Sequence, residues 1–334
     1  MEQIIVKTYS IDQINREEWD AQIFQFSNIA QTYEWAQYRQ LDRINPLFLI
    51  ATRQNITIGS WLVFVRETLL GTIVEIDSEP LIVDLDRRDE IIQVLFSEIE
   101  QMKPLEIRWS NYTLSRYAKK EFFTSNNFDI VQKYNAFIVN LKQDTSLIWE
   151  NMDKKVRNDI RFAAKNKVQI LDSDNIREYS LLDQQTYKRS NLPPTDFTSL
   201  KKLFYSLKPK NLVHLFFAVQ YDAVISGAII LCCGKKALYF KGATSDNPVR
   251  GSSNLLHWEI MKKLKTEGFE IYDLGGISLD FLSRKALGIQ RFKSGFGGRE
   301  FIFYGGIKTS KTIKGKFFRV VKLLYIIFRK IWKK

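Results

Sequence analysis

Two stretches of the chain, half its length apart, share one pattern of apolar and polar positions. Residues 51–64 and residues 218–231 each show an apolar run, a short polar turn and a second apolar run. In both, an apolar Ile is followed by a Gly/Ser pair, at Ile58 and at Ile225. A short polar break between two strand-like runs predicts a β-hairpin. The pattern therefore predicts the same hairpin twice.

The segments after each hairpin also correspond. Residues 87–102 and residues 252–267 carry apolar side chains at helical spacing, which predicts an amphipathic helix in each copy. A strand-like run follows each helix, at residues 106–109 and residues 270–273. A unit repeated in this order predicts two similar lobes, each built from strands and helices.

The order of elements in each copy is that of the acyl-CoA N-acetyltransferase (GNAT) fold. We therefore predict an α/β protein made of a tandem pair of GNAT-like lobes with mixed sheets. A helical span at residues 147–167 is expected to open the second lobe. The predicted borders are residues 1–144 for the first lobe, 145–307 for the second, and 308–334 for a C-terminal tail.

The basic charge of the chain is concentrated in that tail. The formal net charge is +13, and the segment from Lys308 to the end holds ten Lys or Arg residues and no acid. Aliphatic residues and aromatic residues, among them Phe317 and Trp332, alternate with these cations. A basic, aromatic helix too interrupted to cross a bilayer is typical of binding to an anionic membrane surface. A tail docked on the first lobe, and a contact with tRNA phosphates, are the alternatives.

Composition points to a globular protein without a metal centre. The N-terminus lacks the pattern of a signal peptide, and no apolar run is long enough for a membrane span. The adjacent Cys232 and Cys233 are expected to be buried thiols, which suits a reducing cytoplasm. The two histidines, His214 and His257, are expected to be structural. No metal site and no cofactor are predicted.

The most specific motifs lie in the second half of the chain. A helix with an aromatic–acid pair at residues 253–261 precedes a strand that ends in Tyr-Asp-Leu-Gly-Gly-Ile at residues 272–277. Phe-Lys-Ser-Gly-Phe-Gly-Gly follows at residues 292–298. This succession resembles the Fem family, the enzymes that attach amino acids to the peptidoglycan stem peptide. A basic helix at residues 155–168 and a Thr-x-x-Arg element at residues 186–189 are also similar.

The resemblance implies an aminoacyltransferase of peptidoglycan biosynthesis, and so a role in cell wall biogenesis and cell shape. The donor would be aminoacyl-tRNA, and the acceptor an amine of a lipid-linked or UDP-linked muropeptide. The chain has no sustained heptad segment, so it resembles the compact members that lack a coiled-coil arm. The expected location is cytoplasmic, peripheral at the inner face of the cell membrane.

Two residues are candidates for the chemistry of transfer. Attack of an amine on an ester requires both reactants to be held, an oxyanion to be stabilised and a proton to be accepted. Lys293 stands among glycines in what we expect to be a loop, and the resemblance implies a lysine near the reaction centre. Asp273 ends a strand, where its carboxylate can accept a proton or orient the amine. It equally suits a cap on the turn that follows.

Further residues are candidates for substrate binding. Arg157 and Arg161 lie one helical turn apart, on a face that can meet phosphates or simply be solvated. The Thr-x-x-Arg element supplies Tyr187 and Arg189 as candidate acceptor contacts. The two glycine-containing motifs supply Tyr272, Phe292, Gly295 and Phe296.

Two other functions remain open. The first is an acyl-CoA-dependent N-acyltransferase acting on a cell-surface sugar or peptide precursor. Residues 248–254 occupy the place of a pyrophosphate-binding loop but do not have its spacing. The second is a non-catalytic nucleic-acid or membrane-binding protein on the same lobes. The nearly balanced charge outside the tail weakens general nucleic-acid binding.

Overall fold

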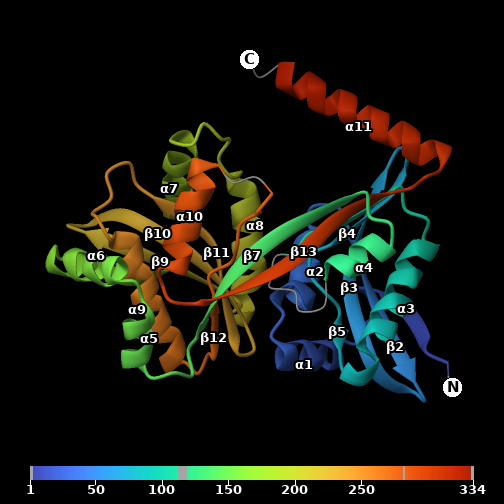
Figure 1. Cartoon of the computed structure of the whole chain (residues 1–334), viewed down its shortest axis with the longest axis horizontal. Helices are drawn as coiled ribbons and strands as arrows, with labels where there is room; N and C mark the ends of the chain where they lie inside the picture. The colour runs from blue at the N-terminus through green and yellow to red at the C-terminus, as the bar shows by residue number, and fades with distance from the viewer. Residues whose placement is uncertain (1–2, 112–118, 281–282, 332–334) are drawn as a thin grey trace. The chain divides into compact units, whose positions relative to one another are not determined.

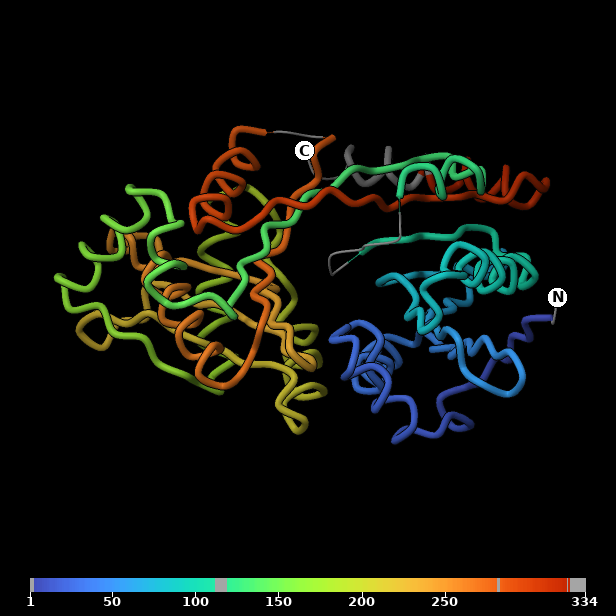
Figure 2. The backbone as a smooth tube through the Cα atoms, turned by 60° about the horizontal axis from the view of Figure 1, so that its bottom comes forward, coloured from blue at the N-terminus to red at the C-terminus, as the bar shows by residue number. Residues whose placement is uncertain are grey.

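The computed structural model describes residues 3–111, 119–280 and 283–331, and in the last helix it describes no side chain at position 323 or beyond position 324. The chain forms two compact units. Unit 1 consists of residues 1–19, 39–133 and 303–334, and unit 2 of residues 20–38 and 134–302. Figure 2 traces how the green-to-orange chain builds unit 2 before the red segment returns to unit 1.

Unit 1 is built on a mixed sheet. Its strands lie in the order β1 (Ile5–Ser10), β2 (Asn45–Arg53), β3 (Ile56–Thr68), β4 (Gly71–Ile76), β6 (Glu106–Trp109) and β13 (Arg299–Thr309), and β5 (Leu81–Ile82) pairs with β3. Helix α3 (Arg88–Gln101) packs on this sheet with Ile92, Leu95 and Ile99 buried, which is the apolar face that the spacing predicts. The α-helices α1 (Arg16–Phe26), α4 (Lys120–Ser125) and α11 (Ile313–Ile331) also begin in unit 1.

Unit 2 has a second mixed sheet, in the order β7 (Ile130–Asn140), β12 (Ile271–Asp273), β11 (Lys236–Thr244), β10 (Ala223–Cys233), β9 (Val213–Gln220) and β8 (Gln169–Ser173). Helices α5 (Thr145–Asn151), α6 (Lys154–Lys165), α7 (Ile176–Lys188), α8 (Phe197–Leu207), α9 (Ser252–Thr266) and α10 (Arg284–Ser294) surround it. Helix α2 (Tyr33–Gln40) also begins in this unit. Cys232 and Cys233 are buried free thiols, as expected.

The predicted repeat is confirmed in detail. Both hairpins, β2–β3 and β9–β10, turn through two residues with positive φ, Gln54–Asn55 and Tyr221–Asp222. Positive φ at both central positions gives a turn whose twist matches that of the flanking strands. In each copy the strand after the helix, β6 or β12, pairs in parallel with the strand before it, β4 or β11. The tandem α/β fold follows from this shared order.

The structure revises the predicted borders. β7 and β13 each contribute residues to both units, so neither unit is one continuous segment. β7 pairs with β12 through residues 138–140, and the far end of β13 pairs with β6 through residues 306–309. The predicted helical span at residues 147–167 is two helices, because α5 ends at Asn151 and α6 begins at Lys154.

The C-terminal segment is a helix, α11 (Ile313–Ile331), shown in red in Figure 1. β13 extends to Thr309, so the first residues of the predicted tail belong to the sheet. Lys322 Nζ lies 2.7 and 2.9 Å from the two carboxylate oxygens of Glu106. Arg319 Nη2 lies 3.0 Å from Asp129 Oδ2. Residues 332–334 are outside the described part. Among described residues, no helix is both long enough and apolar enough to cross a membrane.

Candidate active site

A cavity opens in unit 2 where two neighbouring strands separate. β11 and β12 pair only through residues 236–238 and 271–273. Across β11, the register with β10 shifts so that Phe240 is the extra residue of a bulge. The resulting cavity has a volume of about 990 Å3. Its walls come from α7, β11, the start of α9 and the inner face of α10, and include Tyr187, Tyr239, Lys241, Ser252, His257, Phe292 and Lys293.

Lys293 reaches this cavity from the last turn of α10. The prediction of a loop position is wrong, because α10 continues to Ser294 and only the glycines after it leave the helix. Lys293 is 8% exposed, and its Nζ donates to the Gly276 carbonyl at 3.3 Å. Burial lowers its pKa to about 8, although the charge of Asp273 acts in the opposite direction. A cation held in a low-dielectric wall suits stabilisation of developing negative charge.

An aromatic cluster forms the floor beside Lys293. The His257 ring lies between those of Tyr239, Phe292 and Phe296, with centroid distances of 4.2, 5.5 and 5.6 Å. His257 Nδ1 is 2.6 Å from the hydroxyl of the fully buried Tyr272. Burial, reinforced by the charge of Lys293, lowers the pKa of His257 to about 3. His257 is therefore neutral at physiological pH and keeps this side of the lysine apolar.

Of the predicted aromatic contacts, only some reach the cavity. Phe292 lines it. Phe296 and Tyr272 are fully buried and stand behind the lining residues. They support the wall that holds Lys293.

Asp273 occupies the turn that follows β12. Its Oδ1 accepts the Gly275 N–H at 2.8 Å, and its Oδ2 lies 2.8 Å from Lys236 Nζ. The side chain is fully buried and does not line the cavity. This is the geometry of the turn cap. Asp273 still acts on the site, because its charge raises the pKa of Lys293.

The glycines of the Phe-Lys-x-Gly-Phe-Gly-Gly motif serve close packing. A Cβ at Gly295 would lie 2.8 Å from the Val156 side chain, and the Gly295 carbonyl accepts the Asp153 N–H at 2.9 Å. Gly297 has φ of +74°, and a Cβ there would lie 2.2 Å from the Asn151 carbonyl oxygen. The motif thus fixes the end of α10 against α5 and α6. Gly295 does not line the cavity.

Sequence reasoning missed a partly buried ion pair beside Tyr187. Lys241 Nζ lies 2.8 Å from Asp183 Oδ1 and 3.2 Å from the Tyr187 hydroxyl, and 4.6 Å from the centre of that ring. An ammonium group only donates, so the Tyr187 oxygen accepts and its own O–H is available to a ligand. Two signals were present: a lysine inside an otherwise apolar strand, and an acid one helical turn before Tyr187.

Arg189 joins α7 to β11. Its guanidinium group lies 2.7 Å from Asp246 Oδ1, 2.8 Å from the Thr244 carbonyl and 2.6 Å from the Thr244 hydroxyl. Thr186 also accepts the Thr244 N–H at 2.8 Å. The Thr-x-x-Arg element is therefore a clamp that places Tyr187, and Arg189 does not itself line the cavity.

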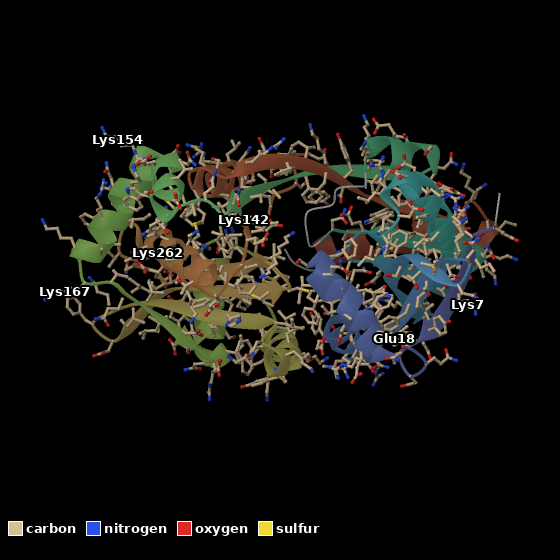
Figure 3. The ribbon with its side chains drawn as sticks, turned by 90° about the horizontal axis from the view of Figure 1, so that it is seen from below. Lys7, Glu18, Lys142, Lys154, Lys167 and Lys262 are labelled. Atoms are coloured by element: carbon tan, nitrogen blue, oxygen red, sulfur yellow. The ribbon has the colours of Figure 1, made fainter. Side chains whose placement is uncertain are left out.

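Arg157 and Arg161 lie away from the cavity. Arg157 donates to the carbonyls at the end of α5, including that of Glu150 at 2.8 Å. Arg161 is exposed, with its guanidinium group 5.2 Å from the Trp149 ring centre. Lys154 and Lys167, at the two ends of this helical segment, also lie at the surface (Figure 3). The face can meet a charged partner, but Arg157 is already used in capping α5.

Metal-ligating side chains do not gather in the described residues, where His, Cys, Asp and Glu form no group of three that could hold an ion. The cavity instead offers a lysine, a tyrosine hydroxyl and a neutral histidine. These groups suit transfer of an acyl group between oxygen and nitrogen.

Part of the chain matches a known protein family, and its fold is similar to that of solved structures. Residues 208–325 match the FemAB family. The structure of FemX is similar to this chain, with a TM-score of 0.73 at 15% identity, over 91% of this chain and 97% of FemX. No curated protein matches the chain in sequence.

Two further structures share the fold. The C-terminal domain of a putative lysylphosphatidylglycerol synthetase from Agrobacterium fabrum has a TM-score of 0.57 at 13% identity, over 92% of this chain and 96% of that domain. A tandem GNAT protein of the clavulanic acid biosynthesis pathway has 0.54 at 8% identity, over 92% and 98%. At these identities the likeness establishes the fold. The region that matches the FemAB family includes Lys293, and the fold of the chain is similar to those of FemX and a tandem GNAT protein.

Proposed function

We propose that this chain transfers an amino acid from aminoacyl-tRNA to an amine of a peptidoglycan precursor, carried on a lipid or on UDP. The observation that carries the proposal is Lys293, a buried cation at the wall of a large cavity, within the segment that matches the FemAB family. The family match does not identify the donor or the acceptor, and experiment must decide both.

The reaction forms one bond and breaks one. The acceptor nitrogen attacks the ester carbonyl of the aminoacyl group, and the carbonyl oxygen becomes an oxyanion. The Lys293 ammonium group stabilises this oxyanion. The intermediate collapses with formation of the amide, the C–O ester bond breaks, and the ribose hydroxyl of the tRNA takes up a proton that the amine releases. The aromatic floor excludes water and so limits hydrolysis of the ester.

Tyr187 is proposed to hold the acceptor. Its hydroxyl is fixed by Lys241 and Asp183 and can donate to a carbonyl or carboxylate oxygen of the stem peptide.

The helix α11 is proposed to keep the enzyme at the cytoplasmic face of the membrane, where a lipid-linked acceptor resides.

An acyl-CoA donor is the second candidate, and one observation favours it. Residues 248–254 line the cavity and span the turn before α9 and its first residues, which is the place that a pyrophosphate-binding loop would take. Their spacing differs from such a loop, so we place this donor second.

Donor and acceptor can be identified in one experiment. Radiolabelled amino acids on a total charged-tRNA pool are offered with a UDP-linked muropeptide, with a lipid-linked muropeptide, and with phosphatidylglycerol. Labelled acetyl-CoA is run in parallel, and Lys293→Met serves as the inactive control. Label that passes from tRNA to a muropeptide, and is lost after RNase treatment, supports the proposal. Label that arrives only from CoA, or only on the phospholipid, overturns it.

A further inference from the structure

A second cavity, of about 770 Å3, lies in unit 1 at the start of α11. We call it the lysine pocket. Four of its lining residues are cations, and Pro104, Leu105, Ile107 and Ile313 give it apolar walls; the cations are Lys103, Lys308, Lys311 and Lys314. The hydroxyl groups of Ser310 and Thr312 add polar atoms to the lining.

Most of this positive charge is not neutralised. Lys308 pairs with Glu100, which also lines the pocket. Lys103, Lys311 and Lys314 form no ion pair with any residue that the structure describes. Three unpaired cations around one hollow repel each other, and an anion between them relieves that repulsion. The pocket therefore suits an anionic group such as a phosphate.

The helix that starts at this pocket, α11, exposes its apolar face and turns charged side chains toward the protein, the reverse of an ordinary surface helix. Ile313, Phe317, Val320 and Leu324 recur at helical spacing, and each is at least half exposed, from 50% at Leu324 to 87% at Ile313. The charged Arg319 and Lys322 reach instead toward carboxylates of unit 1. Such an exposed apolar stripe needs a partner surface.

The stripe and the pocket are continuous, since Ile313 belongs to both. Exposed Lys314 and Lys316 flank the stripe on its two sides. An apolar stripe between lysines matches the interface of an anionic membrane, where the apolar residues enter the acyl region and the lysines remain at the phosphates.

We propose that the lysine pocket binds the phosphate headgroup of an anionic membrane lipid, while the apolar stripe of α11 lies in the membrane surface. The inference rests on the proposed membrane association of α11 and is independent of the transfer reaction. The apolar walls and the adjoining stripe favour a lipid over the phosphates of tRNA, which offer no acyl chain.

The test is flotation of the full chain with phosphatidylcholine vesicles, prepared with and without phosphatidylglycerol. The pocket variant is Lys103→Gln/Lys311→Gln/Lys314→Gln. The matched control is Lys7→Gln/Lys119→Gln/Lys120→Gln, which removes the same charge from exposed positions of the same unit; Lys7 is labelled in Figure 3. Thermal unfolding of both variants checks that the fold is kept, and transfer to a UDP-linked acceptor is measured separately.

The pocket variant is expected to lose at least about tenfold in binding to the anionic vesicles, since each lysine near such a surface contributes a several-fold gain. The control should lose much less, and Phe317→Ser/Leu324→Ser should lose binding to all vesicles.

Equal losses of binding in the pocket variant and the control would show that only the total positive charge matters, and would overturn the site. Displacement of the protein from vesicles by millimolar inorganic phosphate would indicate a site for free phosphate instead. A loss confined to tRNA binding would also overturn the lipid proposal. Transfer to the UDP-linked acceptor should be unchanged, so failure of the pocket and failure of the proposed reaction are distinguishable.

Discussion

At the scale of single residues, Lys293 combines a functional gain with a cost to folding. Its ordinary pKa of 10.5 falls to about 8 in the folded chain because the side chain is buried. Between these values the unfolded chain holds more protons, so stability rises with pH across this window. Below about pH 8 the buried lysine is charged in the folded chain, and its burial lowers the free energy of unfolding by the full amount. A pKa shift of this size corresponds to about 3 kcal/mol.

Lys293→Met is therefore expected to abolish transfer and to stabilise the fold. Near pH 7 the free energy of unfolding should rise by up to about 3 kcal/mol, and the difference from wild type should shrink as the pH approaches 10.5. Denaturant unfolding at several pH values measures both effects. A variant that is less stable than wild type at pH 7 would show that the lysine contributes contacts that outweigh its desolvation.

The same pKa sets an expected limit on activity. If Lys293 acts as a cation, kcat should fall as pH rises through about 8, because the ammonium form is lost. Lys293→Arg keeps the charge and should move this decline to higher pH at a lower maximal rate. Ester hydrolysis without enzyme is subtracted at each pH. A kcat that rises through pH 8 in both proteins would assign the residue a role as a base or none.

Tyr187→Phe tests the proposed acceptor contact. Removal of the hydroxyl should raise the acceptor KM by about tenfold, the equivalent of one hydrogen bond, and change kcat little. The control is Tyr205→Phe, an exposed tyrosine of α8 in the same unit. Equal KM values for both variants would exclude the contact. Lys241 is a poorer choice for mutation, because its removal leaves the buried Asp183 carboxylate uncompensated.

At the scale of elements, the clamp between α7 and β11 decides where Tyr187 stands. Arg189→Lys keeps the charge but loses the several donors that reach Thr244 and Asp246. We expect a loss of about 1 to 2 kcal/mol in the free energy of unfolding and a raised acceptor KM. Lys188→Arg, at the exposed neighbouring position, is the control and should change neither. A stability loss with an unchanged KM would separate the clamp from acceptor binding.

The local pattern of apolar and polar residues is enough to predict most of the helices and strands of the repeated unit. Both hairpins, α3, α9 and the strands after them follow from apolar spacing and short polar turns, which act over a few residues. The glycines that follow Lys293 predict a loop, whereas Ser283, ten residues earlier, caps a helix that includes Lys293. The spacing of residues does not reveal the partners of Arg189, since Asp246 lies 57 residues away along the chain. Arg157 donates to the Glu150 carbonyl at the end of α5, and phosphate binding by this residue stays a prediction.

At the scale of the whole molecule, a truncation between the last strand and α11 should have a different effect from a truncation within that strand. A chain ending at Ser310 keeps the pairing of β13 with β6 through residues 306–309. It should fold and transfer to a UDP-linked acceptor, but should not bind anionic vesicles. A chain ending at Gly305 lacks that pairing and should unfold at a clearly lower temperature. Circular dichroism and flotation measure the two properties. Vesicle binding by the chain ending at Ser310 would remove α11 from the interface.

The interleaving of the two units has a consequence for biosynthesis. Unit 2 is complete once residue 302 has left the ribosome, whereas unit 1, although begun first, waits for residues 303–309 to supply the strand beside β6. The second-made unit is thus free to fold first, and the unfinished edge of the first must be protected until residues 303–309 have been made. A nascent chain stalled between unit 2 and these residues would hold one finished unit and one open sheet, and would be the form most exposed to chaperones and proteases.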